Sequence, residues 1–503
     1  MTTINFYLNI YPQMTEFFLV MVTCFSTLFG VVYSNSTNKN FPVLMKNMSF
    51  LFVQSLMQSL LLMVNFDPIF MMNWSNLLIC NSFVFYMKTM ITIFMQFWFF
   101  SFFKAMNKTL NFEFWILNLL SLMASFFIMQ ANDLTSMYIS VEFLSLIFYV
   151  LASFKRDSEF STEAGTKYFM TGSFSSGTLT FGISLLYSLV GLTNFQDTAL
   201  FFTGYSYLQD NFVMSGIAMS LVFILTSFLF KLGSAPFHFW TPDVYEGVST
   251  PMVSFFVMVP KLTLISLMTR FFYTVSLDFL VNQTSSFFLT CALLSTLVGT
   301  FGALHQKKWK RFIAYSSMSH VSFLLMNVCS MNLNNLNNLM FYLMFYLIMT
   351  MSFFIFFTYF NTAKSVTKFR NNRFLSSLSN LNTLNPMASI SMSVILFSMA
   401  GVPPLVGFFA KFIVLFSAIS QGTMILPIFV LFFNCISCFY YIRTMNVMYF
   451  SNKFYCTKLP VVSNMPHAAS TVLGILIFTM AFANFHFEIF FILINLMCLP
   501  FSY

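Results

Sequence analysis

Four ionisable residues lie inside long apolar runs of this 503-residue sequence. Glu142 is in SMYISVEFLSLIFYVLASF, and Lys231 is in VFILTSFLFKLGSAPFHFW. Lys261 follows Pro260, and Lys411 is in SMAGVPPLVGFFAKFIVLF. A charge near the centre of a bilayer costs about 2.5 kcal/mol or more, so such residues usually face protein or water and carry function. These four positions are therefore the first candidates for chemistry.

Lysine and glutamate in these places suit the movement of protons. Burial lowers the proton affinity of a lysine, and a nearby carboxylate raises it again. Moving Glu142 toward or away from Lys231 would switch that affinity, which a gated proton relay requires. The alternative is that the four groups form structural ion pairs between helices.

Two of the lysines lie in runs that glycine and proline interrupt. The interrupting residues are Gly233 and Pro236 in the first run, and Gly401, Pro403 and Pro404 in the second. A proline inside a helix leaves a carbonyl free, which a membrane tolerates only where protein or water satisfies it. The matched interruptions resemble the discontinuous helices of transporters.

The elements that must position these residues are membrane-spanning helices, each of about 20 mainly apolar residues. The apolar runs predict about fourteen crossings, near 15–33, 43–65, 81–103, 113–131, 134–154, 166–190, 212–232, 250–272, 284–304, 311–330, 338–360, 386–420, 423–448 and 469–497. Strands are not expected, because the runs lack the alternation of a membrane barrel. The predicted fold is an all-α polytopic membrane protein with broken seventh and twelfth helices.

The two broken helices are five crossings apart, and an odd offset reverses direction through the membrane. Helices 4–8 and 9–13 are therefore predicted to be inverted five-helix repeats. We expect a single membrane domain over 1–503. Its predicted parts are a three-helix segment (1–110), the first repeat (111–275), the second repeat (276–450) and a C-terminal helix (451–503).

Composition excludes a soluble protein, because 58% of the residues are hydrophobic and only 7% are charged. The net charge of +9 does not indicate nucleic acid, since the basic residues lie between hydrophobic stretches and form no continuous patch. Cys435 and Cys438 form a C-x-x-C, but no second pair completes a metal site, so packed thiols are expected.

The basic residues also predict the orientation of the chain. Connections after odd-numbered crossings hold Lys39, Lys46, Lys104, Lys108, Lys155, Arg156, Lys307, Lys308, Lys310, Arg311, Lys364, Lys368, Arg370, Arg373, Arg443, Lys453 and Lys458. Connections after even-numbered crossings hold Arg270 alone. This bias puts the odd connections on the cytoplasmic or matrix side and both termini on the opposite side.

Three further ionisable residues, Lys88, Lys167 and His320, also lie within predicted crossings. Lys88 is near the end of its crossing, so its side chain is expected to reach the interface. For Lys167, also near an end, an interfacial position and a functional role both stay open. His320 could link Lys261 to Lys411 through water, and a bond to a nearby backbone carbonyl is the alternative.

Some polar residues are assigned to connections or surfaces. Asp243 and Glu246 are expected to order a loop at a membrane surface, and His238 is expected to cap or pack. The stretches 331–340 and 370–386 are predicted to be polar connections, because Asn and Ser are frequent in both.

In five segments the sequence resembles the antiporter-like membrane subunits of complex I, the respiratory NADH:ubiquinone oxidoreductase. They are NDLTSMYISVEFLSL (132–146), EAGTKYFMTGSFSSG (163–177), FKLGSAPFHFWTPDVYEGVSTP (230–251), KRFIAYSSMSHVSFLLM (310–326) and AGVPPLVGFFAKF (400–412). Together these motifs are specific, and they cover roughly 130–420.

The resemblance implies that Glu142 is the fifth-helix carboxylate and that Lys231 is its partner on the broken seventh helix. It makes Lys261 the central relay and Lys411 the exit-side lysine on the broken twelfth helix. Lys167 aligns with an additional sixth-helix lysine. The implied activity is proton translocation driven by redox chemistry in other subunits.

Family membership implies that this chain binds no cofactor, and that NADH, FMN, iron–sulfur clusters and ubiquinone belong to partner subunits. The implied partners are neighbouring antiporter-like subunits, accessory subunits and lipids such as cardiolipin. The implied location is the mitochondrial inner membrane, with both termini on the intermembrane-space side; a bacterial plasma membrane is the alternative. A free-standing cation/proton antiporter subunit and a non-pumping structural subunit remain rival functions.

Overall fold

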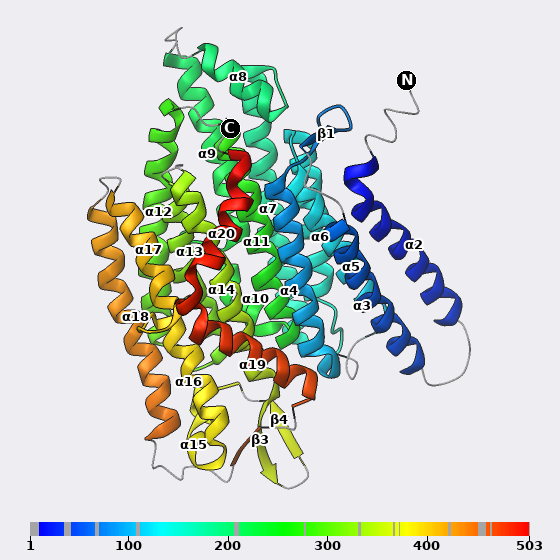
Figure 1. The fold of residues 1–503 in the computed structure, drawn as a ribbon, viewed down its shortest axis with the longest axis vertical. Coiled ribbons are helices and arrows are strands. Elements are labelled where there is room, and N and C mark those ends of the chain that lie inside the picture. The colour runs from blue at the N-terminus through cyan, green and yellow to red at the C-terminus, as the bar shows by residue number, and fades with distance from the viewer. Residues whose placement is uncertain are drawn as a thin grey trace. The chain divides into compact units, whose positions relative to one another are not determined.

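The computed structural model describes residues 10–34, 42–65, 70–106, 111–205, 211–275, 278–329, 333–365, 368–371, 373–420, 424–450, 459–462 and 465–501. Lys39, Lys108, Lys453 and Lys458, which the charge pattern assigns to connections, lie outside these residues. Helices dominate the described part of the chain (Figure 1).

The first half of the chain contains helices α2 to α11. Their bounds are α2 (Met14–Ser34), α3 (Pro42–Asn65), α4 (Ser82–Met106), α5 (Glu113–Gln130), α6 (Leu134–Ala152), α7 (Glu159–Val190), α8 (Phe195–Tyr205), α9 (Asn211–Leu232), α10 (Trp240–Gly247) and α11 (Thr250–Val275).

The second half contains helices α12 to α20. Their bounds are α12 (Asp278–Leu304), α13 (Trp309–Val328), α14 (Leu333–Tyr359), α15 (Leu381–Leu384), α16 (Pro386–Ala400), α17 (Val406–Ser420), α18 (Ile425–Tyr449), α19 (His467–Phe482) and α20 (Phe487–Cys498). Short 3-10 helices are η1 (Tyr11–Gln13), η2 (Leu375–Leu378), η3 (Ala483–His486) and η4 (Leu499–Phe501).

The predicted all-α polytopic membrane fold is confirmed. Within the described residues, 12 helical stretches are long and apolar enough to cross a membrane. Two further predicted crossings fall on helices that miss this criterion: α13 carries many serines, and the crossing at 386–420 consists of the shorter helices α16 and α17. The count of fourteen and the inverted repeats stay predictions.

The expectation that the crossings are helices and not strands is confirmed, and the connections contain short strands that were not predicted. Strands β1 (Met71–Asn73) and β2 (Leu78–Cys80) form an antiparallel hairpin, and β3 (Phe360–Ser365) pairs with β4 (Lys368–Asn371) and β5 (Leu459–Val462). All five lie between the helices. The argument from alternation applies to strands that cross a membrane, and it does not extend to short strands in connections.

Several predicted helix bounds also need correction. Helix α7 begins seven residues before the predicted 166, and α8 was not predicted. The crossing at 469–497 is not continuous, because η3 separates α19 from α20. The predicted polar connections are partly helical, since α14 begins at Leu333 and both η2 and α15 fall within 370–386.

The chain divides into two compact units. Unit 1 comprises Met1–Lys231, Val259–Asn282 and Leu496–Tyr503, and unit 2 comprises Leu232–Met258 and Gln283–Asn495. In unit 1, α5 packs against α2 and α6, and Trp115 contacts Phe52 with ring centroids 5.3 Å apart. In unit 2, α14 packs against α13, α16, α17 and α19.

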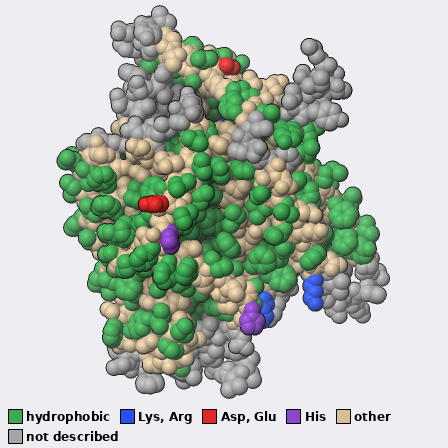
Figure 2. All heavy atoms as spheres, in the orientation of Figure 1, with side chains coloured by type: hydrophobic (Ala, Val, Ile, Leu, Met, Phe, Trp, Pro, Cys, Tyr) green, Lys and Arg blue, Asp and Glu red, His purple; other side chains and the backbone are tan. Residues whose placement is uncertain are grey.

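The surface is apolar where the long helices are exposed. Phenylalanine, leucine, isoleucine and methionine side chains are exposed along α2, α7, α18 and α20. On the face in Figure 2, hydrophobic side chains cover most of the described surface, and charged ones are few. Large apolar areas of this kind mark surfaces that contact lipid or other membrane proteins.

Glycine residues permit both helix breaks. Gly233 has φ +71° and Gly401 has φ +83°, in the left-handed region that favours glycine. A Cβ at Gly233 would overlap the Thr241 side chain. Gly407 brings α17 against α16 so closely that a Cβ there would overlap the Ser398 carbonyl oxygen.

Candidate functional site

The Glu142 and Lys231 side chains form an ion pair between α6 and α9. Lys231 Nζ lies 2.9 Å from Glu142 Oε1, and both side chains are largely buried. The Ser145 hydroxyl donates to the Glu142 carbonyl at 2.9 Å. Each charge of a buried pair stabilises the other, and removing one partner is costly. The protonation of this pair therefore depends on how far apart its members are.

Lys231 occupies the last turn of α9, immediately before the first helix break. The carbonyl groups at a helix C-terminus carry partial negative charge, which favours a cation. The lysine thus has a helix end as well as Glu142 to stabilise its ammonium form. If the Glu142 carboxylate moved away, the Lys231 ammonium would lose the stronger of its two stabilising interactions.

Lys261 lies in the interior of α11 and is only 3% exposed. Pro260, directly before it, has no N–H, so the Phe256 carbonyl loses its helical donor. Lys261 therefore lies beside a local irregularity of a buried helix. An ionisable side chain in such a place is costly unless protein groups or water accompany it.

Lys411, in α17, has three oxygen acceptors. Its Nζ donates to the Met399 carbonyl at 2.8 Å, the Ala400 carbonyl at 3.0 Å and Asn434 Oδ1 at 2.7 Å. The two carbonyls are at the end of α16, which Gly401 terminates in a left-handed conformation. The second break therefore stabilises an ammonium through a helix end and a neutral amide.

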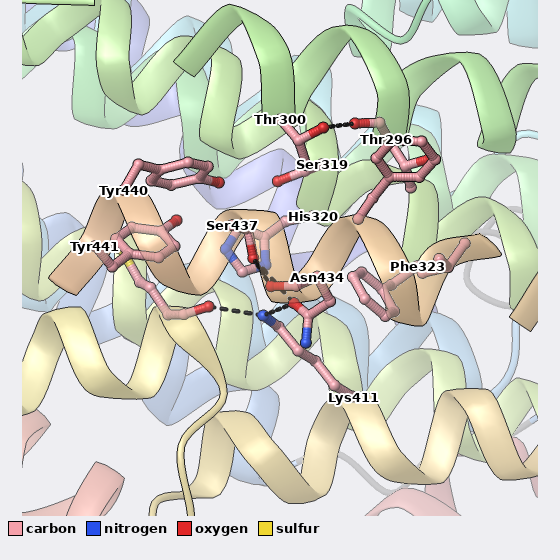
Figure 3. A pocket seen from close by; sticks show the side chains of 13 residues that line it. Thr296, Thr300, Ser319, His320, Phe323, Lys411, Asn434, Ser437, Tyr440 and Tyr441 are labelled. Carbon is pink, nitrogen blue, oxygen red and sulfur yellow. Dashed lines mark hydrogen bonds between the residues drawn. The ribbon is translucent and has the colours of Figure 1, made fainter. Parts of the chain in front are cut away.

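A small pocket of about 10 Å³, room for about one water molecule, lies beside Lys411 in unit 2 (Figure 3). Its polar lining comprises Thr296, Thr300, Ser319, His320, Lys411, Asn434, Ser437, Tyr440 and Tyr441. Asn434 and Ser437 are on α18, and the Ser437 hydroxyl lies 3.1 Å from Asn434 Oδ1. A small pocket with several donors and acceptors in its lining suits an ordered water.

His320 lines the same cavity from α13. Its Nδ1 lies 2.7 Å from the Tyr342 hydroxyl on α14, and its side chain is buried. The structure therefore brings His320, Asn434 and Lys411 around one cavity. It places Lys231, Glu142 and Lys261 in unit 1.

Lys167 is on the exposed side of α7. It pairs with Glu163, one turn earlier, at 2.7 Å, and both side chains are about half exposed. An exposed pair of this spacing contributes little stability. Its environment thus differs from that of the four buried groups.

Two predictions about basic residues were wrong. Lys88 does not reach the interface: it is buried and paired with Glu16 of α2. Arg270 is not in a connection: it lies within α11, is 2% exposed and donates to the Met129 carbonyl. In both cases a partner distant in sequence satisfies the charge, which no local pattern reveals.

A second group of charges joins α10 to the start of α13, outside the stretches long enough to span a membrane. Arg311 contacts Asp243 at 2.8 Å and also pairs with Glu246, which Lys308 contacts as well. Burial raises the pKa of the Glu246 carboxyl, but the Lys308 hydrogen bond and the Arg311 charge outweigh it and lower the pKa below 4.5. Asp243 and Glu246 are thus on a helix and not in a loop.

Sequence reasoning missed Asn434 and Glu16. The signal for Asn434 was a polar amide within the apolar stretch ILPIFVLFFNCISCF. The signal for Glu16 was an acid at the start of the first predicted crossing, MTEFFLVMV. Both signals are present in the sequence, but only the fold shows that Asn434 contacts Lys411 and that Glu16 contacts Lys88.

Comparison with known proteins yields one family and several relatives. The family described as NADH:quinone oxidoreductase/Mrp antiporter, transmembrane, matches residues 131–437. The chain is 36% identical to the NADH-ubiquinone oxidoreductase chain 2 of Marchantia polymorpha over 88% of this chain and 89% of the relative. It is also 36% identical to the NADH-quinone oxidoreductase subunit N of Paramagnetospirillum magneticum, over 74% of this chain and 76% of the relative.

The fold has a counterpart among solved structures. A chain of respiratory complex I from Thermus thermophilus superposes with a TM-score of 0.72, covering 93% of this chain and 97% of that chain, at 22% identity. At this identity the likeness concerns the fold.

Proposed function

Because the chain belongs to the NADH:quinone oxidoreductase and Mrp antiporter family of membrane subunits, we propose that it translocates protons as an antiporter-like subunit of the membrane arm of complex I. In this role it is part of an NADH:ubiquinone oxidoreductase and contains no redox centre of its own. NADH, FMN, iron–sulfur clusters and ubiquinone are bound by partner subunits.

One observation carries the proposal: a buried lysine accompanies each of the two helix breaks. Lys231 faces a carboxylate at the first break, and Lys411 faces carbonyl and amide oxygens at the second. A lysine stabilised by acceptors that can move apart takes up a proton in one arrangement and gives it up in another. Purely structural ion pairs would not require a polar cavity beside Lys411.

The proposed cycle begins with a charge change in a neighbouring subunit that alters the Glu142–Lys231 pair. As the carboxylate moves away, the Lys231 ammonium loses its counter-charge and passes its proton to Lys261. His320 and water carry the proton on to Lys411, from which it is released. Lys167 is an additional candidate for proton uptake, on the side of α7 that is exposed in this chain.

The proposed architecture has two inverted repeats, formed by predicted crossings 4–8 and 9–13. Each repeat contains one of the two helix breaks. The proposed boundaries are 111–275 and 276–450, preceded by the three-helix segment 1–110 and followed by the helix within 451–503. In this scheme the two breaks act as equivalent hinges of opposite orientation.

We place the chain in the mitochondrial inner membrane, with both termini on the intermembrane-space side. The relatives include bacterial subunits, so a bacterial plasma membrane is the alternative setting. Neighbouring antiporter-like subunits, accessory subunits and lipids such as cardiolipin are the proposed partners.

The test is the proton yield of assembled complexes in sealed vesicles. We expect Lys231→Ala and Glu142→Gln to lower the protons moved per NADH oxidised, whereas Lys104→Ala, at an exposed helix end, leaves the ratio unchanged. An unchanged ratio in the first two variants would contradict the relay and favour a non-pumping structural subunit.

The family description also includes Mrp antiporters, so a free-standing cation/proton antiporter is the second candidate. It predicts cation/proton exchange without NADH oxidation. Purification of the native chain distinguishes the two: flavin and iron–sulfur subunits accompany a complex I subunit and are absent from an antiporter.

A further inference from the structure

The last helical stretch carries two ionisable residues that the proton relay does not use. Glu488 is in the first turn of α20, and His486 ends the 3-10 helix η3 directly before it. Both side chains are exposed. Neither has a hydrogen bond or an ion pair within the part of the chain that the structure describes.

These residues lie far from both ends of an apolar span. The stretch His467–Phe501 is long and apolar enough to cross a membrane. Glu488 lies 21 residues after the first residue of this stretch and 13 before the last. The carboxyl group is therefore carried by the inner part of an apolar stretch that is long enough to cross a bilayer.

The packing of α20 leaves this carboxyl on its outer side. Phe487 and Phe491 pack on Phe341 of α14, with ring centroids 5.7 and 5.1 Å apart. The opposite side exposes Phe485, Ile489 and Ile492 around Glu488. Figure 2 shows how few acidic and histidine side chains interrupt the hydrophobic face in view.

The interruption between α19 and α20 is held in place from within unit 2. Asn484 donates to the Pro404 carbonyl, and the Ser398 hydroxyl lies 3.3 Å from Met480 Sδ. The Glu488 carboxyl is thus presented from an anchored backbone. No cationic side chain pairs with it among the residues that the structure describes.

We propose that the outer face formed by Phe485, His486, Glu488, Ile489 and Ile492 is a docking surface for a membrane helix of a neighbouring subunit, one that places a Lys or Arg side chain against Glu488. Apolar residues alone would suit lipid tails equally well. An ionised carboxylate does not, because charge in hydrocarbon is costly unless an opposite charge accompanies it. A membrane helix with a Lys or Arg side chain would pack on the apolar residues of this face and also pair with the Glu488 carboxylate.

The first test is chemical modification of the native complex with carbodiimides, read by mass spectrometry of the peptide containing Glu488. We expect protection from hydrophobic dicyclohexylcarbodiimide and from a water-soluble carbodiimide in the intact complex, and modification once the subunits are separated. Modification by the hydrophobic reagent in the intact complex would show a lipid-facing acid. Modification by the water-soluble reagent would show an open aqueous groove. Either result, or protection that persists after separation, overturns the proposal.

The second test is retention of neighbouring subunits on native gels after detergent treatment. We expect Glu488→Lys to reduce retention at least tenfold, and Glu488→Gln less, since glutamine still accepts a hydrogen bond. Asp197→Lys is the matched control, because Asp197 is exposed on α8, outside the spans. Equal retention in Glu488→Lys and the control overturns the proposal. The outcome is independent of proton transfer, since it measures assembly alone.

Discussion

Among the described residues of unit 1 there are two largely buried Lys–Glu pairs, and only one of them belongs to the proposed relay. Glu142 and Lys231 retain 20% and 11% side-chain exposure, whereas Glu16 and Lys88 retain 3% and 6%. Substituting either glutamate with glutamine removes one charge and leaves a buried ammonium. The two substitutions are chemically identical, so they separate a structural role from a functional one.

Removing one partner of a buried pair destabilises a protein by about 3–5 kcal/mol. We expect Glu16→Gln to approach this range, because its pair is almost inaccessible. We expect Glu142→Gln to cost less, about 2 kcal/mol, because a fifth of that side chain remains exposed. The order reverses for function: Glu142→Gln should lose proton translocation, and Glu16→Gln should retain it.

The assay measures both quantities on the same preparations. The thermal midpoint of the assembled complex reports stability, and protons moved per NADH oxidised in sealed vesicles report function. A double variant, Glu16→Leu with Lys88→Met, should recover most of the lost stability, since replacing both members of a buried pair by apolar residues is often neutral. Equal loss of proton yield in Glu16→Gln and Glu142→Gln would refute the assignment of the relay to one pair.

Three further predictions concern other parts of the chain. Gly407→Ala should destabilise the complex by about 1–3 kcal/mol, since its Cβ meets the Ser398 carbonyl, whereas Gly474→Ala, with open space around it, should not; thermal midpoints compare the two. Asn434→Leu should lower proton yield in assembled complexes, because a neutral acceptor of the Lys411 ammonium is lost; a normal yield would separate Asn434 from the relay. The lowered pKa of Glu246 means that its stabilising effect is present above pH 4.5 and is lost as the pH falls through the folded-state pKa. The protection of α10 amides from hydrogen exchange, taken relative to the intrinsic exchange rate at each pH, should therefore fall in acid, and Glu246→Gln should remove that dependence.

The membrane fold follows from sequence because its physical signal is local. A run of about 20 apolar residues is readable without knowing any neighbour, and the predicted crossings fall on helices of the structure. The breaks are equally local, since Gly233 and Gly401 adopt backbone angles that favour glycine. The interrupted last crossing was missed because Ala483–His486 contains neither glycine nor proline. There, contact with the Pro404 segment accompanies the interruption.

In the candidate site, the ionisable residues can be predicted from the sequence, but their partners cannot. The types and depth of Glu142, Lys231, Lys261 and Lys411 identify them as costly charges, because the expense of burying an ion depends on its own surroundings. The acceptors of Lys411 do not follow from such reasoning, since Met399, Ala400 and Asn434 come from a helix end and from another helix.

The sequence by itself determined that this protein crosses a membrane many times, where two of its helices break, and which side chains are too polar for lipid. Only the tertiary structure decided which charges are satisfied by which partners: Lys88 by Glu16, Arg270 by the Met129 carbonyl, and Lys411 by an amide and two carbonyls. The reason is that the hydropathy of a run depends on consecutive residues, whereas electrostatic pairing acts over a few ångströms between residues as much as 141 positions apart in the chain.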